Sequence, residues 1–239
     1  MTNPVRIVHL YPREMNIYGD HGNVLTLARR LEWRGYAAQI IPVNRGDHLP
    51  AGTDLIVGGG GQDSGQGLVV CDLARLGPDL AAMADDGVPM LMVCGLYQLF
   101  GHAFHTGSGA ILHGIGVLDI ETVASPRRMI GNVVARSDDF GQIIGYENHS
   151  GRTTLGPRAR PLGRVDVGIG NNGTDGTEGA RYNNLIGTYL HGSLLPKNPA
   201  IADHLIEIAV KRRFGSAQLR TLDESVTDEA RRIALARPR

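Results

Sequence analysis

Short apolar runs alternate with helical patterns through the first half of the chain, and this alternation limits the possible folds more than any other feature. The segments between the apolar runs repeat apolar residues at helical spacing, as Val24, Leu27 and Leu31 do. Strands that alternate with helices form βαβ units, whose strands run parallel. The expected strands are Val5–Leu10, 37–43, 54–57 and 88–93, and the expected helices cover 24–34 and 65–86, the second divided at Gly77 and Pro78.

The second half of the chain has a different texture. Strand-like pieces separated by Gly, Asn and Asp turns suggest antiparallel additions, and the polar stretch 171–179 is expected to be a mobile loop. A helix follows Pro199 and ends at Gly215. We therefore expect an α/β fold with a mostly parallel central sheet flanked by helices and antiparallel additions in the C-terminal half. It forms one domain over 1–215, followed by a charged helix or tail over 216–239.

The composition excludes several classes of partner and site. The 24 Lys and Arg balance the 24 Asp and Glu, which argues against nucleic acid or an anionic membrane surface as the main partner. No apolar run approaches the roughly 18 residues of a membrane span, and the N-terminus lacks a signal-peptide pattern, so we expect a cytoplasmic protein. Cys71 and Cys94 form no disulfide framework, and no His/Cys spacing indicates a metal site.

Cys94 stands at the end of the apolar run 88–93 and before a short helical pattern over 95–100. Ligands of open α/β sheets bind beyond the carboxyl ends of the strands. A cysteine at a tight strand-to-helix turn is exposed there, and the N-terminus of the helix favours its thiolate. The alternative is a small buried residue at a strand end.

Four glycines, at 58–61, end the neighbouring strand. Glycine lets the backbone approach a ligand, so the N–H groups of Gly60 and Gly61 are candidates to hold an oxyanion together with that of Gly95. A flexible turn or a phosphate loop is the alternative. A Walker phosphate loop is excluded, because no Gly-Lys-Ser/Thr follows.

His191 also follows an apolar strand, over 184–190. A cysteine hydrolase needs a histidine that is distant in sequence but adjacent in space, and it acts as base and acid. His191 fits this requirement, and His149 is the second candidate. We interpret Cys71, within a helical pattern, and the other histidines as structural.

The motifs together resemble the class I glutamine amidotransferases of the cobyric acid synthase type. They are Cys-Gly-Leu-Tyr-Gln at 94–98, Gly-Tyr-Glu-Asn-His-Ser-Gly-Arg-Thr at 145–153 and Tyr-Leu-His-Gly at 189–192. The stretches 15–23 and 194–199 more closely resemble the glutaminase subunits of lipid II isoglutaminyl synthase. The resemblance covers about residues 5–215, and its motifs occur in the family's order.

The resemblance implies glutamine as substrate and no cofactor in this chain. Arg128 would hold the α-carboxylate of glutamine, with Arg127 and Arg152 as the alternatives. Arg128 could instead be a solvated arginine without a role in binding. Gln98 would face the substrate, unless it is a polar residue of the helix surface. The implied partner is a MurT-like, ATP-dependent Mur ligase subunit that activates the D-glutamate of the lipid II stem peptide, so ATP is expected there and the membrane is met only through lipid II.

Two positions depart from the family pattern. Leu96 stands where the family has glycine, and Ser193 stands where the broader superfamily has the glutamate of its triad. The chain then offers a Cys-His dyad, and we hypothesise that an acidic residue of the partner orients His191. Other interpretations stay open: an amidotransferase for another acceptor such as a corrinoid, a non-catalytic scaffold subunit, or a cysteine hydrolase that transfers no ammonia.

Overall fold

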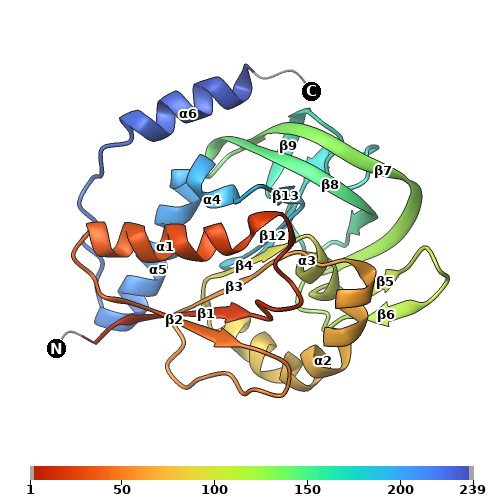
Figure 1. Ribbon diagram of the computed structural model, residues 1–239, viewed down its shortest axis with the longest axis horizontal. Helices are drawn as coiled ribbons and strands as arrows, with labels where there is room; N and C mark the ends of the chain where they lie inside the picture. Colours follow the sequence, from red (N-terminus) through yellow and green to blue (C-terminus); the bar gives the residue numbers. More distant parts are fainter. Residues whose placement is uncertain (1–2, 237–239) are drawn as a thin grey trace.

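The computed structural model describes residues 3–236 and arranges them around two sheets (Figure 1). Sheet A has the strand order β11-β12-β4-β3-β1-β2, and every neighbouring pair is parallel except β11 with β12. This mostly parallel sheet confirms the expected α/β class. Its strands are β1 (Val5–Leu10), β2 (Ala38–Val43), β3 (Leu55–Gly58), β4 (Met90–Val93), β11 (Ala180–Tyr182) and β12 (Leu185–Thr188).

Sheet B carries the antiparallel additions of the C-terminal half. Its path is β10-β9-β7-β5-β6, with β8 paired to both β7 and β13, and only β5 and β7 run parallel. Its strands are β5 (Ala103–His105), β6 (Ile111–His113), β7 (Ile120–Ser137), β8 (Gly141–Leu155), β9 (Gly163–Val167), β10 (Thr177–Glu178) and β13 (Leu190–His191).

Helices pack against sheet A, and α4 contacts β8 of sheet B. α1 and α5 pack against each other and against β1, whereas α2 lies apart from them beside β6 and α3 (Figure 1). The helices are η1 (Ile17–Gly19), α1 (His21–Trp33), α2 (Asp63–Asp85), α3 (Gly95–Leu99), α4 (Leu194–Lys197), α5 (Pro199–Phe214) and α6 (Ser225–Leu235). α5 begins at Pro199 and ends before Gly215 in the left-handed region, as its sequence predicts.

Three local predictions were wrong. α2 is one continuous helix with Pro78 inside it, because its buried apolar face packs along the whole length and outweighs the proline. The strand-like patterns over 116–123 and 128–135 predict two separate strands, but β7 is one long strand with an irregularity between Ala124 and Met129. The polar stretch 171–179 is pinned: Asn171 is buried and its amide donates to the backbone oxygen of Gly179.

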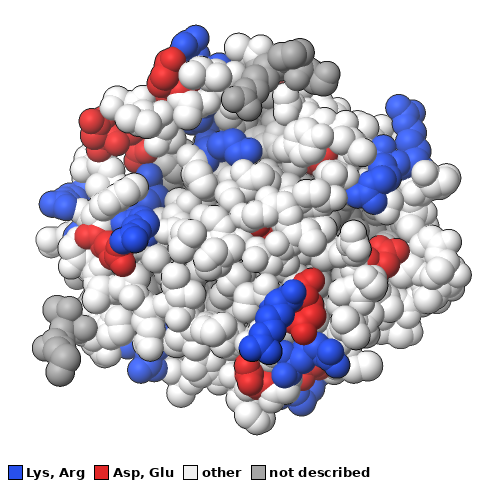
Figure 2. Space-filling view, in the orientation of Figure 1, with Lys and Arg blue, Asp and Glu red and all other residues white. Residues whose placement is uncertain are grey.

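The charged side chains are mixed over the surface. On the face in Figure 2, basic and acidic residues lie interspersed around a largely uncharged centre, in keeping with the zero formal net charge. Within residues 3–236, no helix has the length and apolar character that a membrane crossing requires.

Candidate active site

Cys94 occupies a sharp turn between β4 and α3. Its backbone angles, φ 49° and ψ −100°, lie outside the regions that a residue with a side chain ordinarily adopts. The Cys94 N–H donates to the carbonyl oxygen of Thr188 on the next strand at 2.8 Å, which ties the turn to the sheet. Such a strained strand-to-helix turn is typical of nucleophile elbows.

Leu96 is accommodated by a glycine opposite it. The side chain is fully buried, and a Cβ built on Gly58 would overlap its Cδ1 atom. Because Gly58 has no side chain, the extra bulk of Leu96 fits beneath the elbow. Cys94 keeps the elbow conformation despite the departure from the family pattern.

His191 meets Cys94 across the glycine loop. A Cβ built on Gly60 would lie 2.8 Å from His191 Cε1 and 3.1 Å from the Cβ of Cys94, so both side chains flank the same point. His191 comes from β13, the short strand that pairs with β8, and its side chain is 1% exposed. The sulfur and the imidazole, 97 positions apart in the chain, therefore share one rim of sheet A.

An acid of this chain lies behind the histidine. Asp20, at the start of α1, places Oδ1 3.5 Å from His191 Nδ1, and both side chains are 1% exposed. Its other oxygen, Oδ2, accepts a 2.6 Å hydrogen bond from the Gly60 N–H. The expectation that the chain offers only a Cys-His dyad was wrong, because sequence spacing could not show that the β1–α1 loop brings Asp20 to His191.

The charges of this cluster set the protonation of His191. Burial lowers its pKa, but the charge of Cys94 and the contacts with Asp20 outweigh burial and raise the pKa to about 10. His191 therefore carries a proton throughout the neutral range. A protonated imidazole beside the sulfur stabilises a thiolate and has a proton to give.

The glycine loop offers fewer free donors than its sequence predicts. The N–H of Gly60 is engaged by Asp20 and is not free to hold an oxyanion. The Gly61 nitrogen lies 2.9 Å from where a Cβ of Gly95 would be, so these two glycines approach each other closely beside Cys94. Gly61 and Gly95 remain as the candidate oxyanion donors.

A cavity of about 540 Å³ opens in front of Cys94. Arg128 lines it and donates through Nη2 to Asn148 Oδ1 at 2.7 Å. Arg127 is not part of the wall, and Arg152 donates to the backbone of Asn172 instead. Of the three arginines weighed from sequence, the structure brings only Arg128 to the cavity.

Gln98 also lines the cavity, but both ends of its amide are engaged. Its Oε1 accepts from Gln66 Nε2 at 2.8 Å, and its Nε2 donates to the Tyr189 hydroxyl at 3.1 Å. His149 stacks on the Tyr189 ring with centroids 3.5 Å apart, and it lines the same cavity. The network orients the cavity floor, leaving Gln98 one amide hydrogen for a ligand.

The sequence left Asp20 open, as a residue that lines the site or faces the partner, and gave no role to Tyr18 or Asn148. Tyr18 lines the cavity and stands edge-on to His191 with ring centroids 4.8 Å apart. The stretch 15–23 signalled that this loop matters, but not which side chain turns inward. The side-chain oxygens of Asn16 and Asn23 accept hydrogen bonds from the backbone N–H groups of His21 and Leu195.

Within residues 3–236, no cluster of His, Cys, Asp and Glu is suited to a metal ion.

A cysteine at an elbow, an imidazole and a buried carboxylate at the carboxyl edge of an α/β sheet are the arrangement of a cysteine-nucleophile hydrolase. Comparison with known proteins narrows this class. Residues 6–199 match the CobB/CobQ-like glutamine amidotransferase domain, and the chain belongs to that family.

Two curated relatives cover nearly the whole chain. The chain is 36% identical to lipid II isoglutaminyl synthase (glutamine-hydrolyzing) subunit GatD of Staphylococcus aureus (strain N315), over 97% of this chain and 95% of the relative. The corresponding subunit of Streptococcus pneumoniae is 35% identical over 94% and 88%. Cobyric acid synthase of Brucella abortus (strain S19) is 32% identical, over 65% of this chain but only 32% of the synthase.

Solved structures agree on the fold. A crystal structure of a glutamine amidotransferase superposes with a TM-score of 0.59 at 14% identity, over 84% of this chain and 98% of that one. A glutamine amidotransferase from Thermotoga maritima gives 0.56 at 12% identity, over 97% and 94%. The expected glutamine amidotransferase fold is confirmed.

Proposed function

We propose that the chain is a glutaminase subunit that hydrolyses glutamine to glutamate and ammonia and delivers the ammonia to a partner. The observation that carries this proposal is the buried cluster of Cys94, His191 and Asp20 at the head of a cavity in a glutamine amidotransferase fold. Its parts have the roles that splitting a side-chain amide requires.

In the first half-reaction, the Cys94 thiolate attacks the carboxamide carbon of glutamine. The oxygen of the tetrahedral intermediate takes hydrogen bonds from the N–H groups of Gly61 and Gly95. His191 gives its proton to the nitrogen, because an amide anion is too basic to leave. Ammonia departs, and a γ-glutamyl thioester remains on Cys94.

In the second half-reaction, His191 becomes a base. The charge of Cys94 contributes strongly to the raised pKa of His191, and the thioester has no such charge. The pKa of His191 therefore falls once the sulfur is acylated, and the neutral imidazole can take a proton from the water that attacks the thioester. One histidine serves as acid and then as base.

Substrate recognition rests on the outer part of the cavity. The Arg128 guanidinium is suited to the α-carboxylate of free glutamine, because it can hold both oxygens at once. Asn148 fixes that guanidinium from the neighbouring strand. Gln98 supports the floor beneath the side-chain amide.

For the acceptor we propose the D-glutamate of the lipid II stem peptide, amidated to D-isoglutamine in the cytoplasm by a MurT-like, ATP-dependent ligase subunit. Nearly full-length similarity to the GatD subunit of lipid II isoglutaminyl synthase from two organisms supports this choice. The match to cobyric acid synthase spans a third of that protein, so a corrinoid acceptor is less well supported. ATP would be bound by the partner.

Glutamate release from glutamine tests the proposal. The wild type should release glutamate, and Cys94→Ala should reduce the rate to background, because no other group can form the thioester. Cys71→Ala is the matched control and should keep the wild-type rate, since Cys71 is an exposed helix residue. A Cys94→Ala variant that still turns over, alone and with the ligase subunit, would overturn the assignment.

The acceptor needs its own measurement. Wild-type chain and MurT-like subunit, mixed with glutamine, ATP and lipid II, should yield a product one mass unit lighter than the starting peptide, because an amide replaces a carboxylic acid. Glutamate release without any amidated lipid II would leave the glutaminase intact and exclude this acceptor.

A further inference from the structure

A second cavity, remote from Cys94, is lined by two cross-strand pairs of arginines. Arg136 on β7 lies opposite Arg164 on β9, and Arg160 lies opposite Arg181 on β11. All four line a cavity of about 550 Å³, which shares no residue with the cavity in front of Cys94. Like charges directly opposite on neighbouring strands are unfavourable unless something compensates them.

A close ion pair reaches only one arginine of each pair, although the charge of Arg164 also acts on Asp175 and lowers the pKa of that carboxyl. Arg136 pairs with Asp166 at 2.8 Å, and Arg181 pairs with Asp139. Among residues 3–236, the guanidinium groups of Arg160 and Arg164 form neither an ion pair nor a hydrogen bond. The Arg181 side chain is 7% exposed, and its buried Nε also lacks a hydrogen-bond partner. Within the described residues, the exposed guanidinium of Arg160 is therefore left to solvent or to an added anion.

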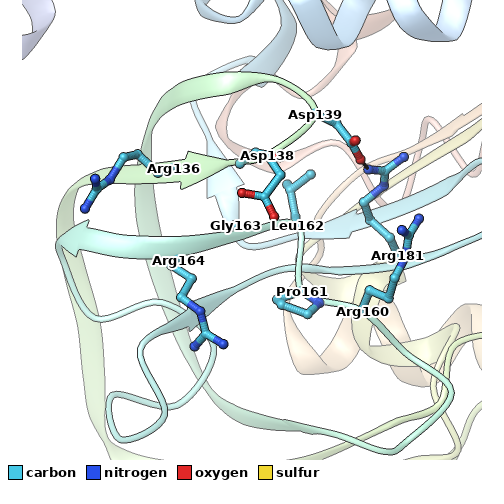
Figure 3. Close-up of a pocket in the computed structure, with 10 residues that line it drawn as sticks. Arg136, Asp138, Asp139, Arg160, Pro161, Leu162, Gly163, Arg164 and Arg181 are labelled. Atoms are coloured by element: carbon cyan, nitrogen blue, oxygen red, sulfur yellow. Dashed lines mark hydrogen bonds and ion pairs between the residues drawn. The ribbon is translucent and has the colours of Figure 1, made fainter.

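The cavity wall also has a carboxylate and an apolar surface. Figure 3 shows Asp138 in the middle, with Arg136 and Arg164 on one side and Arg160 and Arg181 on the other. The Asp138 carboxylate has no partner within the described part of the chain, so it can accept hydrogen bonds from hydroxyl groups. Pro161 and Leu162 supply an apolar surface.

We propose that this cavity binds a sugar phosphate. Arg160, with Arg181 on the same side of Asp138, would take the phosphate, because guanidinium groups match phosphate oxygens in charge and geometry. Asp138 would take sugar hydroxyls, as acidic residues do at ribose sites. The cavity volume lies within the roughly 300–1,000 Å³ range of small-ligand sites. The binding is independent of glutamine hydrolysis.

Calorimetric titration with inorganic phosphate, glucose 6-phosphate and UMP tests the proposal. The sugar phosphates should bind saturably and more tightly than inorganic phosphate. Arg160→Gln should weaken them by about tenfold, the value of one charged hydrogen bond. Asp138→Asn should abolish the preference over inorganic phosphate. Tighter binding of UMP than of glucose 6-phosphate would identify a nucleotide, and the reverse order a free sugar phosphate.

Arg158→Gln is the matched control. Arg158 is exposed, pairs with Asp119 at 3.6 Å and is not part of the cavity wall, so its loss should leave binding unchanged. Equal weakening by Arg158→Gln would reduce the effect to general charge and overturn the site. So would a lack of saturable binding by any of the three probes to a wild-type protein with normal thermal unfolding.

Discussion

At the scale of single residues, Asp20 links parts of the site that the sequence keeps apart. One oxygen faces His191 and the other holds the Gly60 N–H. Its backbone opens α1, yet its side chain caps no helical N–H. An aspartate at such a position ordinarily caps the helix it precedes, so its inward turn serves the imidazole and the glycine loop.

Asp20→Asn should slow glutamine hydrolysis by about 10²–10⁴-fold, because a neutral amide no longer stabilises the imidazolium. The amide oxygen can still accept from Gly60, so the loop should stay in place. His191 has a raised pKa, so its proton is retained at neutral pH and lost as pH rises towards 10.

Without the Asp20 charge the pKa of His191 falls. The alkaline limb of kcat/KM should therefore move to lower pH. A profile of kcat/KM against pH for wild type and variant measures this shift. A slower variant with an unchanged alkaline limb would mean that Asp20 supports the fold only.

At the scale of elements, the glycine loop after β3 is shaped by what surrounds it. Gly60→Ala would drive a methyl group against His191 Cε1 and the Cβ of Cys94. We expect a loss of about 10²-fold in the rate of glutamate release, the usual cost of displacing reacting groups by about 1 Å.

Gly67→Ala is the matched control for Gly60→Ala. Gly67 lies in α2 with open space around it, so an alanine there should keep the rate and raise stability by up to about 1 kcal/mol. Measuring the rates and thermal unfolding of both variants separates the two effects. Full activity in Gly60→Ala would contradict the described closeness of the loop to the catalytic pair.

The same scale shows what sequence patterns can predict. Apolar runs and glycine punctuation located β1, β4 and α5 closely, because burial and capping are local signals. They failed where tertiary packing decides, as in the unbroken α2 with Pro78. They also failed for the 171–179 stretch, where the side chain of Asn171 replaces solvent as the partner of buried backbone groups. Cys94 and His191 were found by their place after strands, whereas Asp20 needed the folded loop.

At the scale of the whole molecule, the proposed catalytic set of Cys94, His191 and Asp20 lies within one chain. The isolated protein should therefore hydrolyse glutamine at a measurable rate, and the ligase subunit should raise that rate without supplying a missing acid. Steady-state glutamate release with and without the subunit tests this. A rate at the Cys94→Ala background in the isolated chain, restored by the partner, would show that Asp20 alone is insufficient.

Stability should depend on the buried acid Glu178, which holds Thr188 beside the nucleophile turn. Burial raises the pKa of Glu178 to about 7, and its Oε1 accepts from the Thr188 hydroxyl and the Tyr189 N–H. Because the folded pKa is above the unfolded value of 4.5, its contribution to stability is full below pH 4.5 and is lost as pH rises towards and beyond 7. The loss is on the order of 3 kcal/mol at most.

Glu178→Gln should flatten this pH dependence, because the amide oxygen can still accept both bonds and carries no charge. Denaturant unfolding at pH 5 and pH 8 gives the comparison. If wild type and variant lose the same free energy of unfolding between these two pH values, another group is responsible.

Asp20 contacts both His191 and the Gly60 N–H, so its acid cannot simply be moved to the position that it occupies in relatives. A glutamate at position 193, where the broader superfamily has its acid, could at most orient the imidazole of His191. The Gly60 N–H would still lose the oxygen that accepts its hydrogen bond. The double variant Asp20→Ala with Ser193→Glu should therefore stay slower than the wild type in glutamate release, because the Gly60 N–H would lack its acceptor. An acid at another position of the chain would therefore not replace Asp20 in full.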